Sequence, residues 1–153
     1  MPMTRRGWVV AGMLMTMALG GCATMSETSA PAKPSLYKRL GGRDGIATVV
    51  DAFVANVIAD NRVNGRFKTL QPAAVFKFKS SLSDQICEAT GGPCSYLGRE
   101  MKAIHAGMKI TDAEWTATVE NLVKALDQRK VGAQEKQELL ATLGPMKASI
   151  VGQ

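Results

Sequence analysis

The strongest constraint on the fold is a helical repeat of apolar residues that runs from residue 35 almost to the end of the chain. Apolar side chains recur three and four residues apart, and no segment alternates convincingly with the two-residue period of a strand. Glycine and proline interrupt the repeat at several points. The sequence therefore predicts a single all-α domain built from helices of unequal length.

The interruptions divide the repeat into six predicted helices. Pro72 suits a first helical position, the run from Thr111 to Glu114 has the pattern of a capping box, and Gly144-Pro145 is expected to kink or weaken the last helix. Glycine-rich breaks of unequal length argue against an up-and-down four-helix bundle. The predicted helices cover residues 36–41, 44–60 and 72–89, a short piece at 101–106, and two longer segments that begin near residues 111 and 133.

The first part of the chain has the pattern of an export signal. Residues 1–6 are basic, and residues 7–19 are apolar but too few for a comfortable membrane span, which needs about 20 residues. Leu19-Gly20-Gly21-Cys22 resembles a bacterial lipobox, so we expect residues 1–21 to be removed and Cys22 to be lipidated. An ordinary cleaved signal and a retained anchor helix stay as alternatives.

The expected domain organisation follows from that cleavage point. Residues 22–35 form a polar, proline-bearing tether, and residues 36–151 form the globular domain. The residue after the lipidated cysteine is Ala23 and not an aspartate. By resemblance to lipoprotein sorting signals, this favours the outer membrane over the inner one. We therefore expect a periplasm-facing lipoprotein, attached to its membrane through the lipid anchor.

The charge distribution argues against a nucleic-acid partner. The formal net charge is +6, but two of the basic residues lie in the segment expected to be removed. The other lysines and arginines are scattered, several of them beside acidic residues, and aromatic residues make up 5% of the chain. A solvated surface explains this pattern better than a basic patch or a platform for stacking bases.

The remaining cysteines, Cys87 and Cys94, flank the turn Gly91-Gly92-Pro93. An exported protein with two free cysteines can join them in a disulfide. Alternatively, Cys87 is a small buried apolar residue of the helix. No Cys-x-x-Cys-His sequence is present, which excludes covalent attachment of a c-type haem.

His105 is the single histidine of the chain. Such a residue is often structural or exposed, but this one ends a short predicted helix, and Gly107 then turns the chain away from it. A closed zinc site needs about four ligands, and no such cluster exists in the sequence. A five-coordinate haem needs only one imidazole from the protein, so His105 is the candidate iron ligand.

From Ser35 to about Val151, the chain resembles the group 1 truncated haemoglobins. The resemblance implies a truncated globin-like two-over-two helical sandwich around haem b, with His105 as the proximal iron ligand and Phe67 packed on the haem. The segments that carry it are residues 36–42, 53–57, 66–67, 91–93, 96–101 and 105–108.

The resemblance also implies the lining of the gas pocket. Many members of the family place a tyrosine where this chain has Val54, so the pocket is expected to be apolar, with Gln85 as the one obvious hydrogen-bond donor. Met101 and Met108 are expected to pack on the porphyrin, and Lys79, Arg99 and Lys102 are candidate partners for its propionates. The implied pocket residues are Phe53, Val54, Phe78, Leu82, Gln85 and Ile86.

The expected function is haem-dependent binding of O2 and other diatomic gases such as NO and CO, for storage, delivery or scavenging. An apolar pocket predicts fast release of O2, because a hydrogen bond to the gas contributes roughly 1–3 kcal/mol. The alternatives are a haem enzyme with nitric oxide dioxygenase or peroxidase activity, supported by an unknown reductase, and a haem redox or sensor module with histidine and methionine ligation. The last alternative is a haem-free structural lipoprotein.

Overall fold

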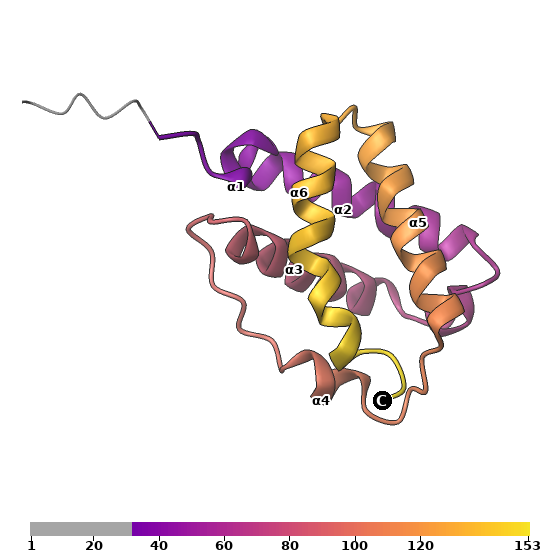
Figure 1. Ribbon diagram of the computed structural model, residues 1–153. Coiled ribbons are helices and arrows are strands. Elements are labelled where there is room, and N and C mark those ends of the chain that lie inside the picture. The colour runs from indigo at the N-terminus through magenta and orange to yellow at the C-terminus, as the bar shows by residue number, and fades with distance from the viewer. Residues whose placement is uncertain (1–31) are drawn as a thin grey trace, which may run out of the picture. The chain divides into compact units, whose positions relative to one another are not determined.

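The computed structural model describes residues 32–153, and Figure 1 shows their arrangement. The predicted signal segment, Cys22 and most of the predicted tether lie outside the described residues. Residues 33–153 form one compact unit. Within the described part of the chain, no helix combines the length and the apolar character needed to cross a membrane.

The described residues are helical, as the apolar repeat predicted. An isolated bridge between Ile110 and Val151 is the one strand-like pairing in this part of the chain. The elements, in chain order, are α1 (Leu36–Arg39), α2 (Gly42–Ala59), the 3-10 turn η1 (Asn64–Arg66), α3 (Pro72–Ala89), α4 (Met101–His105), α5 (Asp112–Gln128), α6 (Ala133–Leu143) and the 3-10 helix η2 (Gly144–Ser149).

Local sequence explains where several helices begin and end. The Thr111 hydroxyl accepts a hydrogen bond from the Glu114 backbone N–H at 3.2 Å, and the Glu114 carboxylate accepts one from the Thr111 N–H at 2.8 Å. These bonds form the predicted capping box of α5, and the bond from the Thr111 backbone lowers the pKa of Glu114. Pro72 opens α3. At Gly144-Pro145 the α-helix gives way to 3-10 geometry, because proline has no N–H to donate.

Helix α2 forms the centre of the domain and packs against both α3 and α5. In Figure 1, α5 and α6 cross in front of α2 and α3, which gives the two-over-two arrangement. Side chains that are buried recur along α2 on more than one face, so the helix is covered on several sides. Its buried apolar residues are Ile46, Val49, Val50, Ala52, Phe53, Val54 and Val57.

A buried polar network fixes the contact between α2 and α5. The Asn56 amide donates to the Asn121 carbonyl at 3.3 Å and to the Gln128 side chain at 3.2 Å, and the Asn121 amide donates to the Asp60 carboxylate at 2.7 Å. Hydrogen bonds from Arg62, with a further one from Asn121, hold the pKa of Asp60 well below its ordinary value. Because each buried polar group needs its partner, the network favours one register of the two helices.

Charged groups join the first and last α-helices. Arg39 of α1 pairs with Glu135 of α6 at 2.6 Å and also with Glu138, which in turn pairs with Lys33 at 3.2 Å. The hydrogen bond from Arg39 is the main reason that the pKa of Glu138 falls from its ordinary value of 4.5 to about 2. A carboxylate whose pKa is lower in the folded than in the unfolded protein stabilises the fold at any pH above the unfolded pKa. This contribution is lost as the pH falls toward the folded pKa.

We predict that Glu138→Gln lowers the stability of the protein at neutral pH and flattens its acid dependence. In the wild-type protein the contribution of this carboxylate is fully present above about pH 4.5 and disappears between there and about pH 2. Urea unfolding of both proteins across this interval measures the difference. The prediction is wrong if the two stability curves stay parallel.

Candidate functional site

His105 is held in one orientation by its own helix. It is the last residue of α4, and its Nδ1 atom lies 2.7 Å from the backbone carbonyl oxygen of Met101, one turn earlier. A carbonyl oxygen can only accept a hydrogen bond, so Nδ1 carries the hydrogen, and in the neutral ring Nε2 keeps its lone pair. Histidines that bind metals commonly use one ring nitrogen in this way, which leaves the other ready to act as a ligand.

The chain turns sharply after the imidazole. Gly107 has a φ of +76°, a backbone conformation that glycine adopts without steric cost, and the Met108 N–H donates to the His105 carbonyl at 3.0 Å. The helix therefore ends directly after its histidine, and the side chain stays half-buried. Met108, expected to pack on a porphyrin, is 37% exposed.

Large apolar side chains near α3 and α4 are incompletely covered by protein. The rings of Phe67 and Phe78 pack with their centroids 5.5 Å apart and their planes tilted by 57°, yet both side chains are half-buried. Val75 and Leu82 on α3, and Ile104 on α4, are half-buried as well. This contrasts with the closed interior along α2. A flat apolar group such as a porphyrin is chemically suited to these side chains, because contact with it would remove their apolar surface from water.

An open hollow of about 400 Å³ lies between α3, α4 and η2. The Gln85 amide donates weakly to the sulfur of Met101 at 3.4 Å and to that of Met146 at 3.5 Å. The structure thus brings together Gln85 and Met101, both predicted site residues. The lining residues are Gln85, Glu88, Ala89, Tyr96, Glu100, Met101, Lys102, Met146 and Ser149.

Sequence reasoning did not assign Met146 or Tyr96 to the site. Met146 continues the apolar repeat of the last predicted helical segment. The repeat indicates that Met146 points inward, but it does not indicate which residues Met146 contacts. Tyr96 lies in an irregular segment, where no periodicity shows which way a side chain points. Both line the hollow beside Gln85 and Met101.

Three other predicted pocket residues lie in the closed core. Phe53 is 8% exposed, Val54 1% and Ile86 2%. Protein atoms surround these side chains, whereas Phe78, Leu82, Gln85 and Met101 keep part of their surface open. Phe78 and Leu82 pack against the core that contains the first group.

The candidate propionate partners differ in their surroundings. Lys102 lines the hollow, next to Met101. Lys79 forms an ion pair with Asp51 of α2 at 2.9 Å, and the carbonyl of Arg99 accepts a hydrogen bond from the Tyr96 hydroxyl at 3.0 Å. Of the three cations, Lys102 is the one that lies at the hollow.

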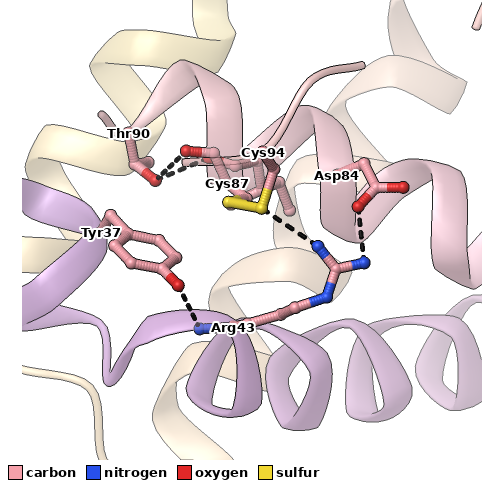
Figure 2. The surroundings of a disulfide bond; sticks show 7 residues. Tyr37, Arg43, Asp84, Cys87, Thr90 and Cys94 are labelled. Carbon is pink, nitrogen blue, oxygen red and sulfur yellow. Dashed lines mark hydrogen bonds and ion pairs between the residues drawn. A yellow bond between two sulfur atoms is a disulfide. The ribbon is translucent and has the colours of Figure 1, made fainter. Parts of the chain in front are cut away.

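Cys87 and Cys94 are joined by a disulfide. It links the buried end of α3 to the segment that leads toward α4 (Figure 2). The turn between the two cysteines is tight, because a Cβ atom on Gly92 would lie 2.5 Å from the Cys87 sulfur and 2.6 Å from the Tyr37 ring. The alternative in which Cys87 serves only as a small core residue therefore does not describe this structure, although the residue is indeed fully buried.

A family model described as bacterial-like globin matches residues 35–151. The chain belongs to the bacterial-like globin family. This truncated globin is 29% identical over 116 residues to a group 1 truncated haemoglobin from Mycolicibacterium paratuberculosis, with 76% of this chain and 83% of the relative covered. It is 30% identical over 102 residues to a group 1 truncated haemoglobin from Tetrahymena thermophila, with 67% of this chain and 82% of the relative covered.

Solved structures agree with this assignment. The truncated globin matches a truncated haemoglobin from Tetrahymena pyriformis in its Fe(III) form with a TM-score of 0.73 and 26% identity, covering 78% of this chain and all of the other. A haemoglobin of the 2/2 type from Synechococcus, in the cyanomet state and with covalently attached haem, matches with a TM-score of 0.70, 30% identity and the same coverage. The predicted family and the predicted two-over-two helical fold are therefore confirmed.

Proposed function

We propose that this truncated globin binds haem b through Nε2 of His105 and takes up O2 and other diatomic gases. The observation that carries the proposal is the hydrogen bond between Nδ1 of His105 and the Met101 carbonyl, which fixes the ring and leaves Nε2 free to bind. Haem, when bound, supplies an iron with an open position for a gas. Globin relatives and the half-buried apolar side chains around α3 and α4 support the same proposal.

Each neighbouring residue then has a physical role. Phe67 and Phe78 offer aromatic surface to the porphyrin, and Met101 and Met108 offer flexible apolar side chains that fill irregular space. Lys102 offers a positive charge at the edge of the hollow, suited to a propionate. The core residues behind them keep water away from the gas.

The gas pocket offers little hydrogen bonding. Val54, Phe78 and Leu82 carry no donor, and the amide of Gln85 is directed at the sulfurs of Met101 and Met146. O2 gains from a nearby donor because it becomes partly negative when it binds to haem, whereas CO gains much less. We therefore expect fast release of O2 and weak discrimination against CO and NO.

The first prediction from the proposed function is that His105→Ala abolishes the haem absorption bands that the wild-type protein shows after haem is added. The substitution removes the single imidazole of the chain. Absorption spectra of the ferric and ferrous proteins measure the loss, and imidazole added to the buffer should restore part of the ferrous five-coordinate spectrum.

Ala103→Ser is the matched control, because residue 103 is exposed on the same short helix. It should keep the wild-type bands. Unchanged bands in His105→Ala would refute the assignment of the ligand, and a six-coordinate histidine–methionine spectrum in the wild-type protein would favour a redox module instead.

The second prediction is that Leu82→Gln slows the release of O2. Leu82 is half-buried on α3, so a longer polar side chain has room to turn toward the gas. A hydrogen bond of about 2 kcal/mol corresponds to a roughly 30-fold slower release. Stopped-flow mixing of the O2-loaded ferrous protein with CO measures the rate.

Leu82→Met, which has similar size and no donor, is the control and should release O2 at nearly the wild-type rate. Slow release already in the wild-type protein would contradict the apolar pocket. Nitrate formed on mixing the O2-loaded protein with NO would measure the alternative dioxygenase activity in the same preparation.

We also propose that the protein is exported and anchored by lipid at Cys22, facing the periplasm, with the outer membrane favoured. The supporting observations are the signal pattern of residues 1–21 and the lipobox-like sequence before Cys22. The disulfide between Cys87 and Cys94 is in keeping with export, because such bonds persist mainly in oxidising compartments.

The third prediction concerns Cys22. Intact-mass measurement of the protein from a Gram-negative host should give a chain that begins at Cys22 and carries acyl groups, and Cys22→Ala should lack them and keep residues 1–21. A mature chain with no acyl group would favour an ordinary signal, and an unmodified full-length chain would favour a retained anchor.

A further inference from the structure

We propose that the Cys87–Cys94 disulfide, together with Arg43, is the positioning element that holds α4 and therefore His105 in place. The importance of His105 rests on the proposed function, but the mechanical argument concerns the protein alone. Helix α4 has to be held from both ends, and the disulfide supplies one of the two attachments.

Helix α4 cannot hold its own position. It has five residues, none of them buried, and its N-cap residue Glu100 makes no capping hydrogen bond through its side chain. Helices this short are unstable in isolation, because the cost of nucleation is not recovered over so few residues. Helix α4 packs on η2, and Met101 accepts a weak hydrogen bond from Gln85 of α3. Beyond these contacts, its placement depends on the segments that precede and follow it.

The C-terminal attachment of α4 is a set of backbone contacts. The Gly152 N–H donates to the Ile110 carbonyl at 2.9 Å, and the Lys109 N–H donates to the Gln153 carbonyl at 2.6 Å. The guanidinium group of Arg66 adds a side-chain hydrogen bond to the Met108 carbonyl. The end of the chain and the corner near Phe67 thus hold the segment that follows His105.

The N-terminal side lacks comparable contacts. In the described part of the chain, no backbone–backbone hydrogen bond ties residues 93–99 to another element. Leu97 in this segment is 93% exposed, and Tyr96 is half-buried beside the hollow. The covalent bond at Cys94 is the strongest attachment between α3 and α4.

Figure 2 shows how that attachment is made rigid. Cys87 is fully buried in α3, so Cys94 is joined to the closed core. Arg43 of α2 donates to the Cys94 sulfur at 3.0 Å and pairs with Asp84 of α3 at 2.7 Å, while its backbone N–H donates to the Tyr37 hydroxyl at 3.1 Å. Helices α2 and α3 therefore hold Cys94 between them.

The consequence is a shorter free connection to the histidine. With the disulfide, the unattached segment before α4 is residues 95–100. Without it the segment is residues 93–100, because the backbone N–H groups of Thr90, Gly91 and Gly92 are still hydrogen-bonded to α3. A longer free loop samples more conformations, so the imidazole would spend less time where iron can meet it. The disulfide would then act on ligand geometry as well as on overall stability.

The test compares the double variant Cys87→Ala/Cys94→Ala with the wild-type protein. In the haem-loaded protein, we expect haem transfer to apomyoglobin to be about 1.5-fold faster or more, from the change in loop length alone, and the iron–histidine Raman band to shift or broaden. In the haem-free protein, amide hydrogen exchange should accelerate across residues 101–108 and stay unchanged in α5.

Arg39→Ala is the control, because it weakens the α1–α6 ion pairs and leaves the disulfide intact. It should lower stability without shifting the Raman band or the exchange at residues 101–108. Arg43→Met keeps the disulfide and should give a smaller change of the same kind as the double variant. The proposal is overturned if the double variant matches Arg39→Ala in all readouts at equal stability.

Failure of this proposal and failure of haem binding can be told apart. If the wild-type protein takes up no haem, the proposed function fails, and the exchange measurement on the haem-free protein still tests the positioning of α4. Suppose that the wild-type protein binds haem and that His105→Ala abolishes this binding. If amide hydrogen exchange and the rate of haem transfer are then the same with and without the disulfide, only the positioning role is refuted.

Discussion

Burial of α2 on several faces is the constraint that organises this domain. Its apolar side chains fill the interior against α3 and α5, and its one buried polar side chain, Asn56, is paired with Asn121 and Gln128. An unpaired amide there would cost about 1–3 kcal/mol, so the network tolerates few alternative registers. With α2 fixed, the faces of α3 and α5 that meet it are fixed as well. The candidate site then involves the residues of α3 and α4 that do not pack against α2.

Packing is least complete in α3 and α4. Helix α3 buries only Ser83, Ile86 and Cys87, all toward its C-terminal end, and α4 buries nothing. A domain of this size has a limited core, and leaving large apolar side chains half-covered reduces it further. Such an arrangement is stable when a ligand covers those side chains, because binding to the folded state adds to its stability.

The sequence predicted the parts of the fold that packing periodicity controls. Helices α2, α3 and α5 have long apolar repeats, so their existence and approximate limits were readable, although α2 begins at Gly42, two residues earlier than predicted. Side-chain direction was harder. Gln85 was expected as a donor in the gas pocket, but its amide contacts two methionine sulfurs, one of them contributed by η2, far along the chain. No local pattern encodes such a contact.

The disulfide shows why spacing alone left an alternative open. Cysteines on either side of a Gly-Gly-Pro turn can meet, but whether they do depends on Gly91, whose φ is +79°, and on the close approach of Tyr37 to Gly92. Tyr37 belongs to α1, so the turn is shaped by an element distant in sequence. A covalent bond is useful at this turn, because residues 93–99 make no backbone–backbone hydrogen bond to another element of the described chain.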